Sequence, residues 1–270
     1  QYSGLGTQIM NLNLKNKTAV VCGSTQGIGK ASALELAELG ANVVLLARNE
    51  ETLKSTLNEL ANNGSQNHSY LVADFSKTEE VKNVINDWAS RNEAQILVNN
   101  TGGPPSGPIA EASEEELLSG FNNHIINNQN LVKALLSGMK NSSFGRIINV
   151  ISTSVKIPIQ GLGVSNTIRG AVANWAKTLS LELAPFGITV NNVLPGFTDT
   201  GRLQSLFEGK AKKLGFTAEQ VKNDSLKSIP AGRLGDPHEV AAAVAFLATP
   251  AAAYINGINV PVDGGRTGSL

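Results

Sequence analysis

A glycine-rich segment near the N-terminus has the residue types and spacing of a phosphate-binding turn. It follows an apolar run and leads directly into a helical pattern; its residues are Gly23, Ser24, Thr25, Gln26, Gly27, Ile28 and Gly29. Glycines let the backbone turn tightly and approach a pyrophosphate, whose charge then faces amide groups at a helix N-terminus. Ordinary strand-to-helix turns also use glycine, but the place after the first strand favours a dinucleotide site.

A Walker A phosphate loop is the competing interpretation of this segment, because Gly29 is followed by Lys30. Two departures oppose it. Gly23 lies one residue too far from that pair, and Ala31 stands where a magnesium-binding Ser or Thr is needed. The segment therefore predicts a dinucleotide turn rather than a nucleoside triphosphate site.

The end of the second predicted strand indicates which dinucleotide is bound. A dinucleotide fold places an acid there to bind the ribose hydroxyls, whereas this chain has Ala47-Arg48-Asn49. An arginine can bind a 2′-phosphate bidentately, so NADP(H) is favoured and NAD(H) is the alternative. Arg48 also has a plainer interpretation, as a solvated residue at the start of a helix.

The elements that must position these residues alternate between short apolar runs and longer helical patterns. Continuous apolar runs are typical of strands buried on both faces. The pattern predicts an α/β fold, a single doubly wound Rossmann-type domain with a seven-stranded parallel sheet and helices on both faces. The predicted strands are 18–22, 41–46, 69–73, 95–98, 146–151, 189–194 and 259–262, and the predicted helices are 29–39, 50–62, 78–91, 114–140, 161–183 and 237–247.

Nothing in the composition divides the chain, so residues 10–270 are predicted to form one domain. Residues 1–9 are polar and contain glycine, which is typical of a loose tail or an artificial leader outside the fold. The helical but more polar segment at about 200–230 follows a strand end, where open α/β sheets place their ligands. It is predicted to be a flap that covers the substrate.

Charge and composition narrow the possible partners. The 22 basic residues balance the 22 acidic ones, so no net field attracts nucleic acid or an anionic membrane. No apolar run approaches the roughly 20 residues of a membrane helix, and the start lacks a signal-peptide pattern. One cysteine, Cys22, suits a reducing compartment, and His68, His124 and His238 lack ligand spacing. The sequence predicts a cytoplasmic protein with a small-molecule partner and no metal site.

Several motifs together resemble the short-chain dehydrogenase/reductase family, closest to its oxoacyl-carrier-protein-reductase-like members, from Leu14 to Gly265. The glycine turn has the family's spacing, and Asn99-Asn-Thr-Gly102 resembles its Asn-Asn-Ala-Gly segment. Val262-Asp-Gly-Gly265 matches the usual end of the last strand. The resemblance implies oxidoreductase activity, a homodimer or homotetramer, and cofactor contacts from Asp74, Phe75, Asn100, Gly102, Arg169, Pro195, Gly196, Thr198 and Thr200.

The match breaks down at the catalytic positions. The family uses a Ser after the fifth strand, followed by a Tyr-x-x-x-Lys pair on the next helix. Ser152 aligns with that Ser, but Ser165 falls at the Tyr position and Arg169 at the Lys position. His124 falls where the family carries a catalytic Asn, and a shift of the helix would present Asn127 or Asn128 instead.

The altered residues leave two hypotheses open. A serine hydroxyl is a far weaker acid than a phenol, so Ser165 cannot simply replace Tyr. In an active enzyme that interconverts a small carbonyl and an alcohol, His124 or an ordered water would donate the proton, and Ser152 would hydrogen-bond the carbonyl oxygen. Arg169 would reach the cofactor ribose or an anionic substrate group. The alternative is a protein that binds its cofactor but has lost activity and acts as a binding or assembly module.

Overall fold

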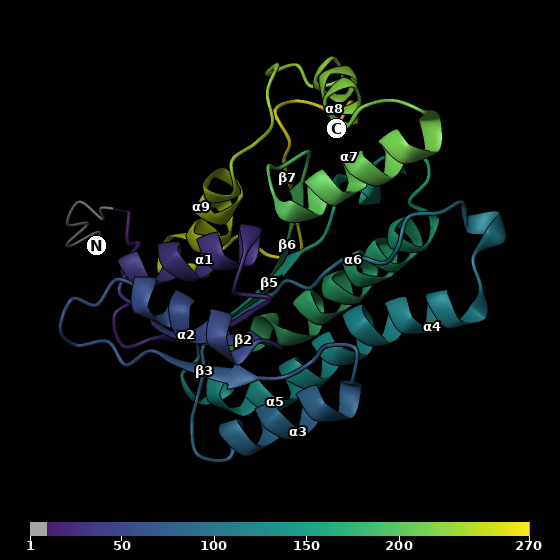
Figure 1. The fold of residues 1–270 in the computed structure, drawn as a ribbon. Coiled ribbons are helices and arrows are strands. Elements are labelled where there is room, and N and C mark those ends of the chain that lie inside the picture. Colours follow the sequence, from purple (N-terminus) through teal and green to yellow (C-terminus); the bar gives the residue numbers. More distant parts are fainter. Residues whose placement is uncertain (1–9, 270) are drawn as a thin grey trace, which may run out of the picture.

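The computed structural model describes residues 10–269, which form one parallel sheet with helices on both faces (Figure 1). The predicted fold class is confirmed, and the predicted tail at residues 1–9 lies outside the described residues. Within the described range the strand order is β3-β2-β1-β4-β5-β6-β7. The strands are β1 (Thr18–Cys22), β2 (Asn42–Ala47), β3 (Ser69–Val72), β4 (Ile96–Asn99), β5 (Gly145–Val150), β6 (Ile188–Pro195) and β7 (Asn259–Val262).

The helices form two layers, one on each face of the sheet (Figure 1). Leu36 of α1 and Val244 of α9 belong to the apolar core of one face, and Ile85 of α3 and Leu131 of α5 belong to the other. The α-helices are α1 (Gly27–Glu38), α2 (Glu50–Glu59), α3 (Thr78–Ala89), α4 (Glu114–Phe121), α5 (Asn127–Asn141), α6 (Gly163–Leu183), α7 (Gly201–Leu214), α8 (Ala218–Leu226) and α9 (Pro237–Ala248).

The strand order places a crevice at the carboxyl ends of β1 and β4. The chain proceeds from β1 outward to β3 and then returns to the other side of β1 to form β4. Connections after neighbouring strands diverge at such a reversal, and ligands of open α/β sheets bind there. The connection after β1 starts at Gly23 and the connection after β4 starts at Asn100. Both predicted cofactor segments therefore border the same crevice.

One predicted helix, residues 114–140, is interrupted in the structure. A π-helical turn at Asn122–Ile126 separates α4 from α5. Such a turn closes its hydrogen bonds one residue later than an α-helix does, and it changes the direction in which the following side chains point. Apolar periodicity missed the turn because the buried stripe continues on both sides of it. His124 lies inside the turn and is buried.

A row of asparagines crosses the second half of the sheet near its carboxyl edge. In-register positions carry these residues on four adjacent strands. Each side-chain amide donates to the next side-chain oxygen along the row, at 2.8 to 2.9 Å; the residues are Asn99, Asn149, Asn192 and Asn259. Amides bonded to one another in this way hold the register of β4 to β7. The row gives the loops after these strands a fixed base.

The predicted flap is a pair of helices with an apolar cluster of its own. Leu203 and Phe207 of α7 pack with Val221 of α8 and with Phe197 in the turn after β6. The Thr200 hydroxyl accepts a hydrogen bond from Leu203 N and caps α7. Figure 1 shows α7 and α8 together on the same side of the molecule as β7. That this pair covers a substrate stays a prediction.

Candidate active site

The turn after β1 has a backbone that favours glycine. Gly23 and Gly27 have φ values of +59° and +52°, in the left-handed region that disfavours other residues. A Cβ atom on Gly29 would lie 2.1 Å from the carbonyl oxygen of Gly23. Helix α1 begins at Gly27 rather than at the predicted Gly29, and the side chain of its N-cap residue Gln26 makes no capping hydrogen bond. Its first amide groups are therefore left to meet an anion.

Segments after β4 and β6 pack against this turn. The Asn100 amide donates to the carbonyl oxygens of Cys22 and Gly23, at 3.3 and 3.4 Å. On the other side, a Cβ on Gly27 would lie 3.2 Å from the Thr200 methyl group. The structure thus brings together three segments that the sequence predicted to hold one cofactor.

Two polar side chains of the turn are occupied by the protein itself. Ser24 is fully buried, and its hydroxyl oxygen accepts a hydrogen bond from Leu46 N at 3.1 Å. The Ser24 side chain therefore faces β2 and not the crevice. This position argues against the prediction that the Ser24 hydroxyl contacts the cofactor directly. Lys30 forms an ion pair with Glu59 at 2.7 Å, so its charge already has a partner in the protein. Cofactor phosphates would meet backbone amides here.

Arg48 and Asp74 lie at the carboxyl ends of neighbouring strands β2 and β3. Arg48 is exposed, and its charge contributes to lowering the pKa of Asp74. The main cause of that lowered pKa is Ser76, whose backbone N–H and hydroxyl both donate to the Asp74 carboxylate. Both residues were predicted from the sequence to contact the cofactor, and their places at neighbouring strand ends allow one ligand to reach both.

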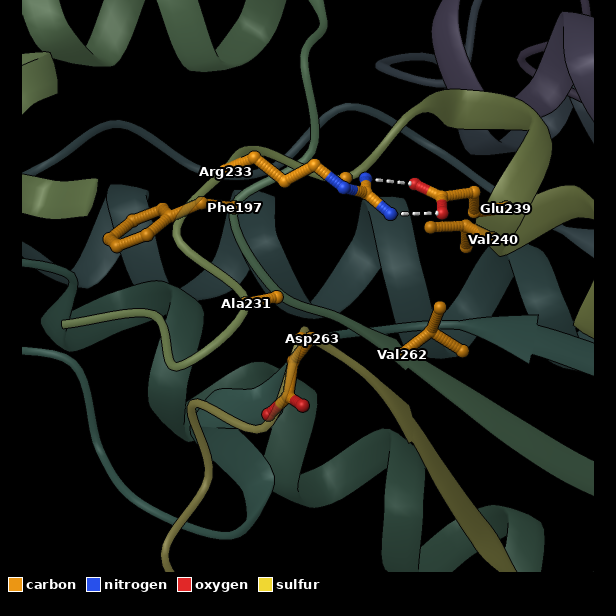
Figure 2. A pocket seen from close by; sticks show the side chains of 9 residues that line it. Phe197, Ala231, Arg233, Glu239, Val240, Val262 and Asp263 are labelled. Carbon is orange, nitrogen blue, oxygen red and sulfur yellow. Dashed lines mark hydrogen bonds and ion pairs between the residues drawn. The ribbon is translucent and has the colours of Figure 1, made fainter. Parts of the chain in front are cut away.

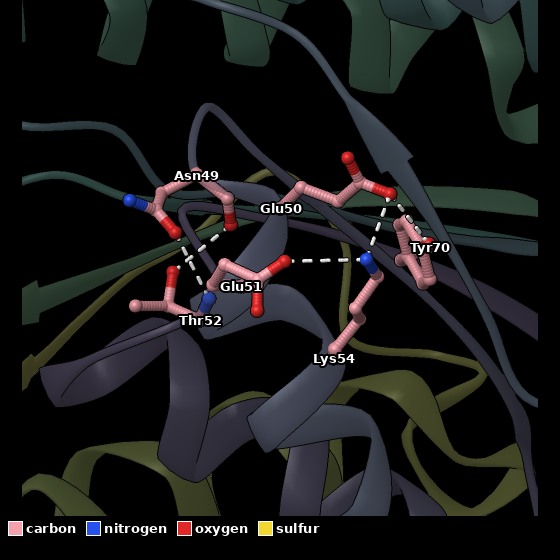
Figure 3. Close-up of polar contacts among 6 residues, drawn as sticks. All are labelled: Asn49, Glu50, Glu51, Thr52, Lys54 and Tyr70. Atoms are coloured by element: carbon pink, nitrogen blue, oxygen red, sulfur yellow. Dashed lines mark hydrogen bonds and ion pairs between the residues drawn. The ribbon is translucent and has the colours of Figure 1, made fainter.

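The acids nearest to Arg48 in the sequence are held by other partners (Figure 3). The Tyr70 hydroxyl donates to the Glu50 carboxylate at 2.9 Å, and Lys54 contacts the same carboxylate at 3.3 Å. Glu51 also pairs with Lys54, at 3.2 Å. Because Lys54 offsets this negative charge on α2, Arg48 is left to attract a phosphate.

Arg169 connects the ends of β4 and β5 at the predicted reaction centre. It is 8% exposed, and its guanidinium donates to the carbonyl oxygen of Val150 at 3.1 Å and to that of Thr101 at 3.4 Å. The Thr101 hydroxyl lies 2.9 Å from Nδ1 of His124. The structure therefore brings Arg169 and His124 together around Thr101, a residue that sequence reasoning did not select.

Burial determines the charge of His124. The side chain is 2% exposed, and desolvation together with the positive charge of Arg169 lowers its pKa to about 2. A hydrogen bond with the backbone of Gly102 favours the charged form but is the weaker influence. The imidazole is thus neutral near pH 7. A neutral imidazole is a very poor acid, so this environment weighs against the hypothesis that His124 donates the proton.

Asn127, one of the two alternatives to His124 at the predicted catalytic Asn position, points toward the segment after β3. Its amide donates to the carbonyl oxygen of Phe75 at 2.7 Å and to that of Asn123 at 3.4 Å. Asn127 therefore supports the segment after β3, close to the predicted contacts Asp74 and Phe75. Asn128 is also buried.

Ser152 and Ser165 are both partly exposed but differ in their partners. The Ser152 oxygen accepts a hydrogen bond from Ser154 N at 3.0 Å, which leaves its own hydroxyl proton free to donate. Within the described residues, the Ser165 hydroxyl has no hydrogen-bond partner. Both lie at the same end of the sheet, because Ser152 follows β5 and Arg169, one turn after Ser165, reaches back to the end of β5.

No described tyrosine supplies the missing phenol. The hydroxyl of Tyr70 is bonded to Glu50 beside α2, and Tyr254 is fully exposed before β7. Tyr2 lies outside the described residues. This agrees with the expectation that none of them acts at Ser165.

The turn after β6 lies close to the segment after β7. A Cβ on Gly196 would lie 2.6 Å from the Cβ of Asp263, so the two backbones approach closely. Thr198 is buried and its hydroxyl donates to the Gly196 carbonyl oxygen at 3.3 Å. These contacts fix the path from Pro195 to Thr200, which the resemblance assigns to nicotinamide binding.

Two small hollows flank this region. One of about 90 Å³ lies between Phe197, Asp263 and the start of α9, and the ion pair of Arg233 with Glu239 crosses its rim (Figure 2). Another of about 150 Å³ begins at Thr153, directly after Ser152; it is lined by Thr153, Ile157, Pro158, Ile159, Ser228, Arg266 and Thr267. Both are smaller than the roughly 300 Å³ of a typical ligand pocket, so a dinucleotide would lie in the open crevice.

Comparison with known proteins identifies the family. A family model described as enoyl-(acyl carrier protein) reductase matches residues 23–267. The 3-oxoacyl-[acyl-carrier-protein] reductase FabG of Vibrio cholerae is 36% identical over 254 residues, covering 94% of this chain and 98% of the relative. The chain is a short-chain dehydrogenase/reductase.

Two further relatives are similarly complete matches to this short-chain dehydrogenase/reductase. BacG of Bacillus subtilis, named an NADPH-dependent reductase, is 31% identical over 259 residues, covering 95% of this chain and 100% of the relative. The solved structure of L-sorbose reductase from Gluconobacter frateurii, complexed with NADPH and L-sorbose, matches with a TM-score of 0.89 and 28% identity. That match covers 97% of this chain and 100% of the other.

Two changes from the family pattern meet in space in this short-chain dehydrogenase/reductase. The resemblance predicts Ala at position 101 and Asn at position 124, and the side chains of Thr101 and His124 contact each other. The Thr in Asn-Asn-Thr-Gly was the available sequence signal for this pair. Arg202 was also missed, because its contact with the Pro104 carbonyl oxygen, at 2.6 Å, spans 98 positions of the chain.

Features of other protein classes are missing from the described part of the chain. Among residues 10–269, no helix combines the length and apolar character of a membrane-spanning segment. The same range contains no group of three or more His, Cys, Asp or Glu side chains arranged to hold a metal ion. Burial raises the pKa of the Cys22 thiol to about 12, so it is an inert packed residue beneath the glycine turn.

Proposed function

We propose that this protein is an NADP(H)-dependent oxidoreductase that interconverts a small carbonyl compound and an alcohol. The observation that carries the proposal is the uncapped start of α1, reached through a turn in which a Cβ on Gly29 would overlap the Gly23 backbone. A dinucleotide pyrophosphate fits such a site in both shape and charge. BacG is named for its dependence on NADPH, and the L-sorbose reductase structure contains NADPH, which supports the cofactor assignment.

Arg48 supports the choice of the phosphorylated cofactor. It occupies the strand end where an acid would favour NAD(H), and Lys54 holds Glu50 and Glu51, which follow it in the sequence. A guanidinium can pair bidentately with a 2′-phosphate, whereas NAD(H) lacks that group. NAD(H) is therefore the weaker ligand in this proposal.

The proposed chemistry keeps the positioning of the reactants and changes the source of the proton. Bound NADPH would supply the hydride. Ser152 donates its free hydroxyl proton as a hydrogen bond to the carbonyl oxygen, and the charge of Arg169 stabilises negative charge that develops there. Neutral His124 is too weak an acid to deliver the proton, so the alkoxide formed by hydride transfer, which is a strong base, takes its proton from solvent water. The hydroxide left behind is neutralised by the surrounding buffer.

The alternative function is a cofactor-binding module without catalytic activity. Ser165 and the neutral state of His124 favour it, because both remove an acid from the reaction centre. Loss of one proton donor lowers a rate by about 10² to 10⁴ and leaves hydride positioning intact, which is why the oxidoreductase is preferred.

Two measurements on the same sample separate these functions. NADPH binding is followed by fluorescence, and turnover is followed by NADPH absorbance with a panel of aldehydes, ketones and keto acids. The oxidoreductase predicts turnover that Ser152→Ala lowers without weakening NADPH binding; Ser90→Ala, at an exposed position after α3, is the matched control. Binding with no turnover of any panel member would favour the module.

We also propose that the chain assembles as a homodimer or homotetramer. Large apolar side chains are exposed on the helices after β4 and β5 and just before β7, including Leu118, Phe121, Leu181 and Ile258. These are the elements through which the resemblance predicts subunit contacts, and exposed apolar side chains on them would be covered in an oligomer. Sedimentation velocity on the protein tests this, and a sample that is only monomeric at micromolar concentration would contradict it.

A further inference from the structure

Two arginines from distant parts of the chain converge on Gly103, in the loop after β4. A Cβ built on Gly103 would lie 3.5 Å from Nη2 of Arg202 and 3.8 Å from Nη2 of Arg169. Arg169 comes from α6 and Arg202 from the first turn of α7. Arg202 also donates to the Pro104 carbonyl oxygen at 2.6 Å, which fixes its reach across the crevice.

The positive charge of this pair is not balanced by the protein. None of the ion pairs formed among residues 10–269 includes Arg169 or Arg202. Burial and the charge of Arg202 together lower the pKa of Arg169 to about 10, which still leaves it protonated near pH 7. A buried cation beside a second cation is unfavourable unless an anion joins them.

The surroundings of Gly103 leave room for such an anion. A Cβ on the neighbouring Gly102 would meet nothing within 4 Å, so this part of the loop faces open space. Each guanidinium makes its protein hydrogen bonds to backbone carbonyl oxygens and has further N–H groups to offer. The N-terminus of α7 adds a partial positive charge on the same side.

We infer that Arg202, with Arg169, forms an anion subsite that binds a carboxylate of the substrate, so that the substrate is an oxo acid or its hydroxy acid. This inference rests on the proposed function for the identity of the reacting group. The subsite is separate from the groups assigned to the cofactor phosphates, which are the start of α1 and Arg48. Arg202 belongs to the flap pair α7 and α8, on the side predicted to cover the substrate.

The test compares acids with their uncharged esters in protein saturated with NADP⁺, where no reduction can occur. The probes are 2-oxohexanoate and 4-oxohexanoate, each paired with its methyl ester, and binding is measured by calorimetry. Arg202→Met removes both the charge of the guanidinium and its paired N–H donors, and Arg202→Lys keeps only the charge. Lys213→Met, an exposed lysine in the last turn of α7, is the matched loss of one charge from the same helix.

The expected result is that at least one acid binds about tenfold or more tightly than its ester, and that Arg202→Met removes this preference. Arg202→Lys should recover part of it, while Lys213→Met and the affinity for NADP⁺ should change less than about twofold. Equal binding of acid and ester would overturn the inference. So would an equal loss of NADP⁺ affinity in Arg202→Met, because the pair would then bind a cofactor phosphate.

Turnover measured with NADPH on the same probes separates this inference from the proposed function. Arg202-dependent binding of an acid that is never reduced would leave the anion subsite standing and would contradict the oxidoreductase. Reduction of acid and ester at equal rates, with equal binding, would support the oxidoreductase and overturn the subsite.

Discussion

The cofactor end of the crevice and its reaction end are built in opposite ways. Around Gly23, glycine is required because backbone atoms leave no space for a Cβ, and the Asn100 amide binds the carbonyl oxygens of the turn. Around Arg169, charges lack counter-ions, and the buried hydroxyl oxygens of Thr153 and Ser154 lack hydrogen-bond partners. A sterically closed backbone tolerates little change, whereas side chains around an open space can be exchanged more freely.

The difference indicates which part of the protein has a fixed ligand. The pyrophosphate of a dinucleotide must approach the backbone of the turn closely, so that backbone is constrained. The reaction end needs only to place a carbonyl group near the nicotinamide, and several side chains can do so. Thr101 and His124 contact each other there, so a change of either residue alters the surroundings of the other.

The largest expected effect, on both cofactor binding and stability, comes from adding a side chain inside the glycine turn. In Gly29→Ala the new methyl group would lie 2.1 Å from the Gly23 carbonyl oxygen, a backbone atom that cannot move without distorting β1. We expect NADPH binding to fall below detection and the free energy of unfolding to drop by about 3 kcal/mol or more. Fluorescence titration and chemical denaturation measure the two effects.

Gly170→Ala is the matched control for that variant. Gly170 lies inside α6, and a Cβ there would meet nothing within 4 Å. Alanine should stabilise the helix by about 0.5 to 1 kcal/mol and leave NADPH affinity unchanged. If Gly29→Ala binds NADPH as well as Gly170→Ala does, the glycine turn is not the cofactor site. The comparison between a constrained cofactor end and an open reaction end would then be wrong.

The next effect is a gain at the reaction end. Replacing Ser165 by Tyr and Arg169 by Lys restores the family's acid, whose hydroxyl pKa of about 10 is far below that of serine. We expect turnover of an uncharged ketone to rise by about 10². The same variant with Phe in place of Tyr lacks the hydroxyl and should show no gain. An equal response of both variants would mean that proton donation does not limit the rate.

Arg48→Glu should produce a smaller change, confined to the cofactor end. The carboxylate repels a 2′-phosphate and can accept hydrogen bonds from ribose hydroxyls. NADPH affinity should fall by about 10- to 100-fold while NADH affinity rises. Lys54→Met is a useful second variant, because it frees the charge of Glu50 and Glu51 without touching Arg48. It should weaken NADPH binding in the same direction but less.

Sequence reasoning reached the cofactor end more completely than the reaction end, for a physical reason. The glycine turn and the strand ends are encoded by neighbouring residues, so local patterns found them. The Thr101–His124 and Arg202–Pro104 contacts join residues 23 and 98 positions apart, and periodicity carries no information about them. The π turn at Asn122–Ile126 also escaped, because it rotates His124 inward without breaking the apolar stripe.

The last expected effect is absent at neutral pH and concerns His124 and the pH dependence of stability. Its pKa is about 2 in the folded chain and about 6.5 when unfolded, so the unfolded chain binds the extra proton first. Stability is therefore complete above about pH 6.5 and falls as the pH drops below that value. The loss from this one group approaches about 1.4 kcal/mol per pH unit.

His124→Asn, which restores the family residue, should remove this part of the acid sensitivity. Denaturant unfolding of both proteins between pH 7.5 and pH 4.5 gives the difference, in which carboxylates common to both cancel. If the two curves stay parallel below pH 6.5, His124 is protonated in the folded chain. His124 would then again be a candidate for the proton donor. The reaction end would in that case hold an acid, as the family's active site does.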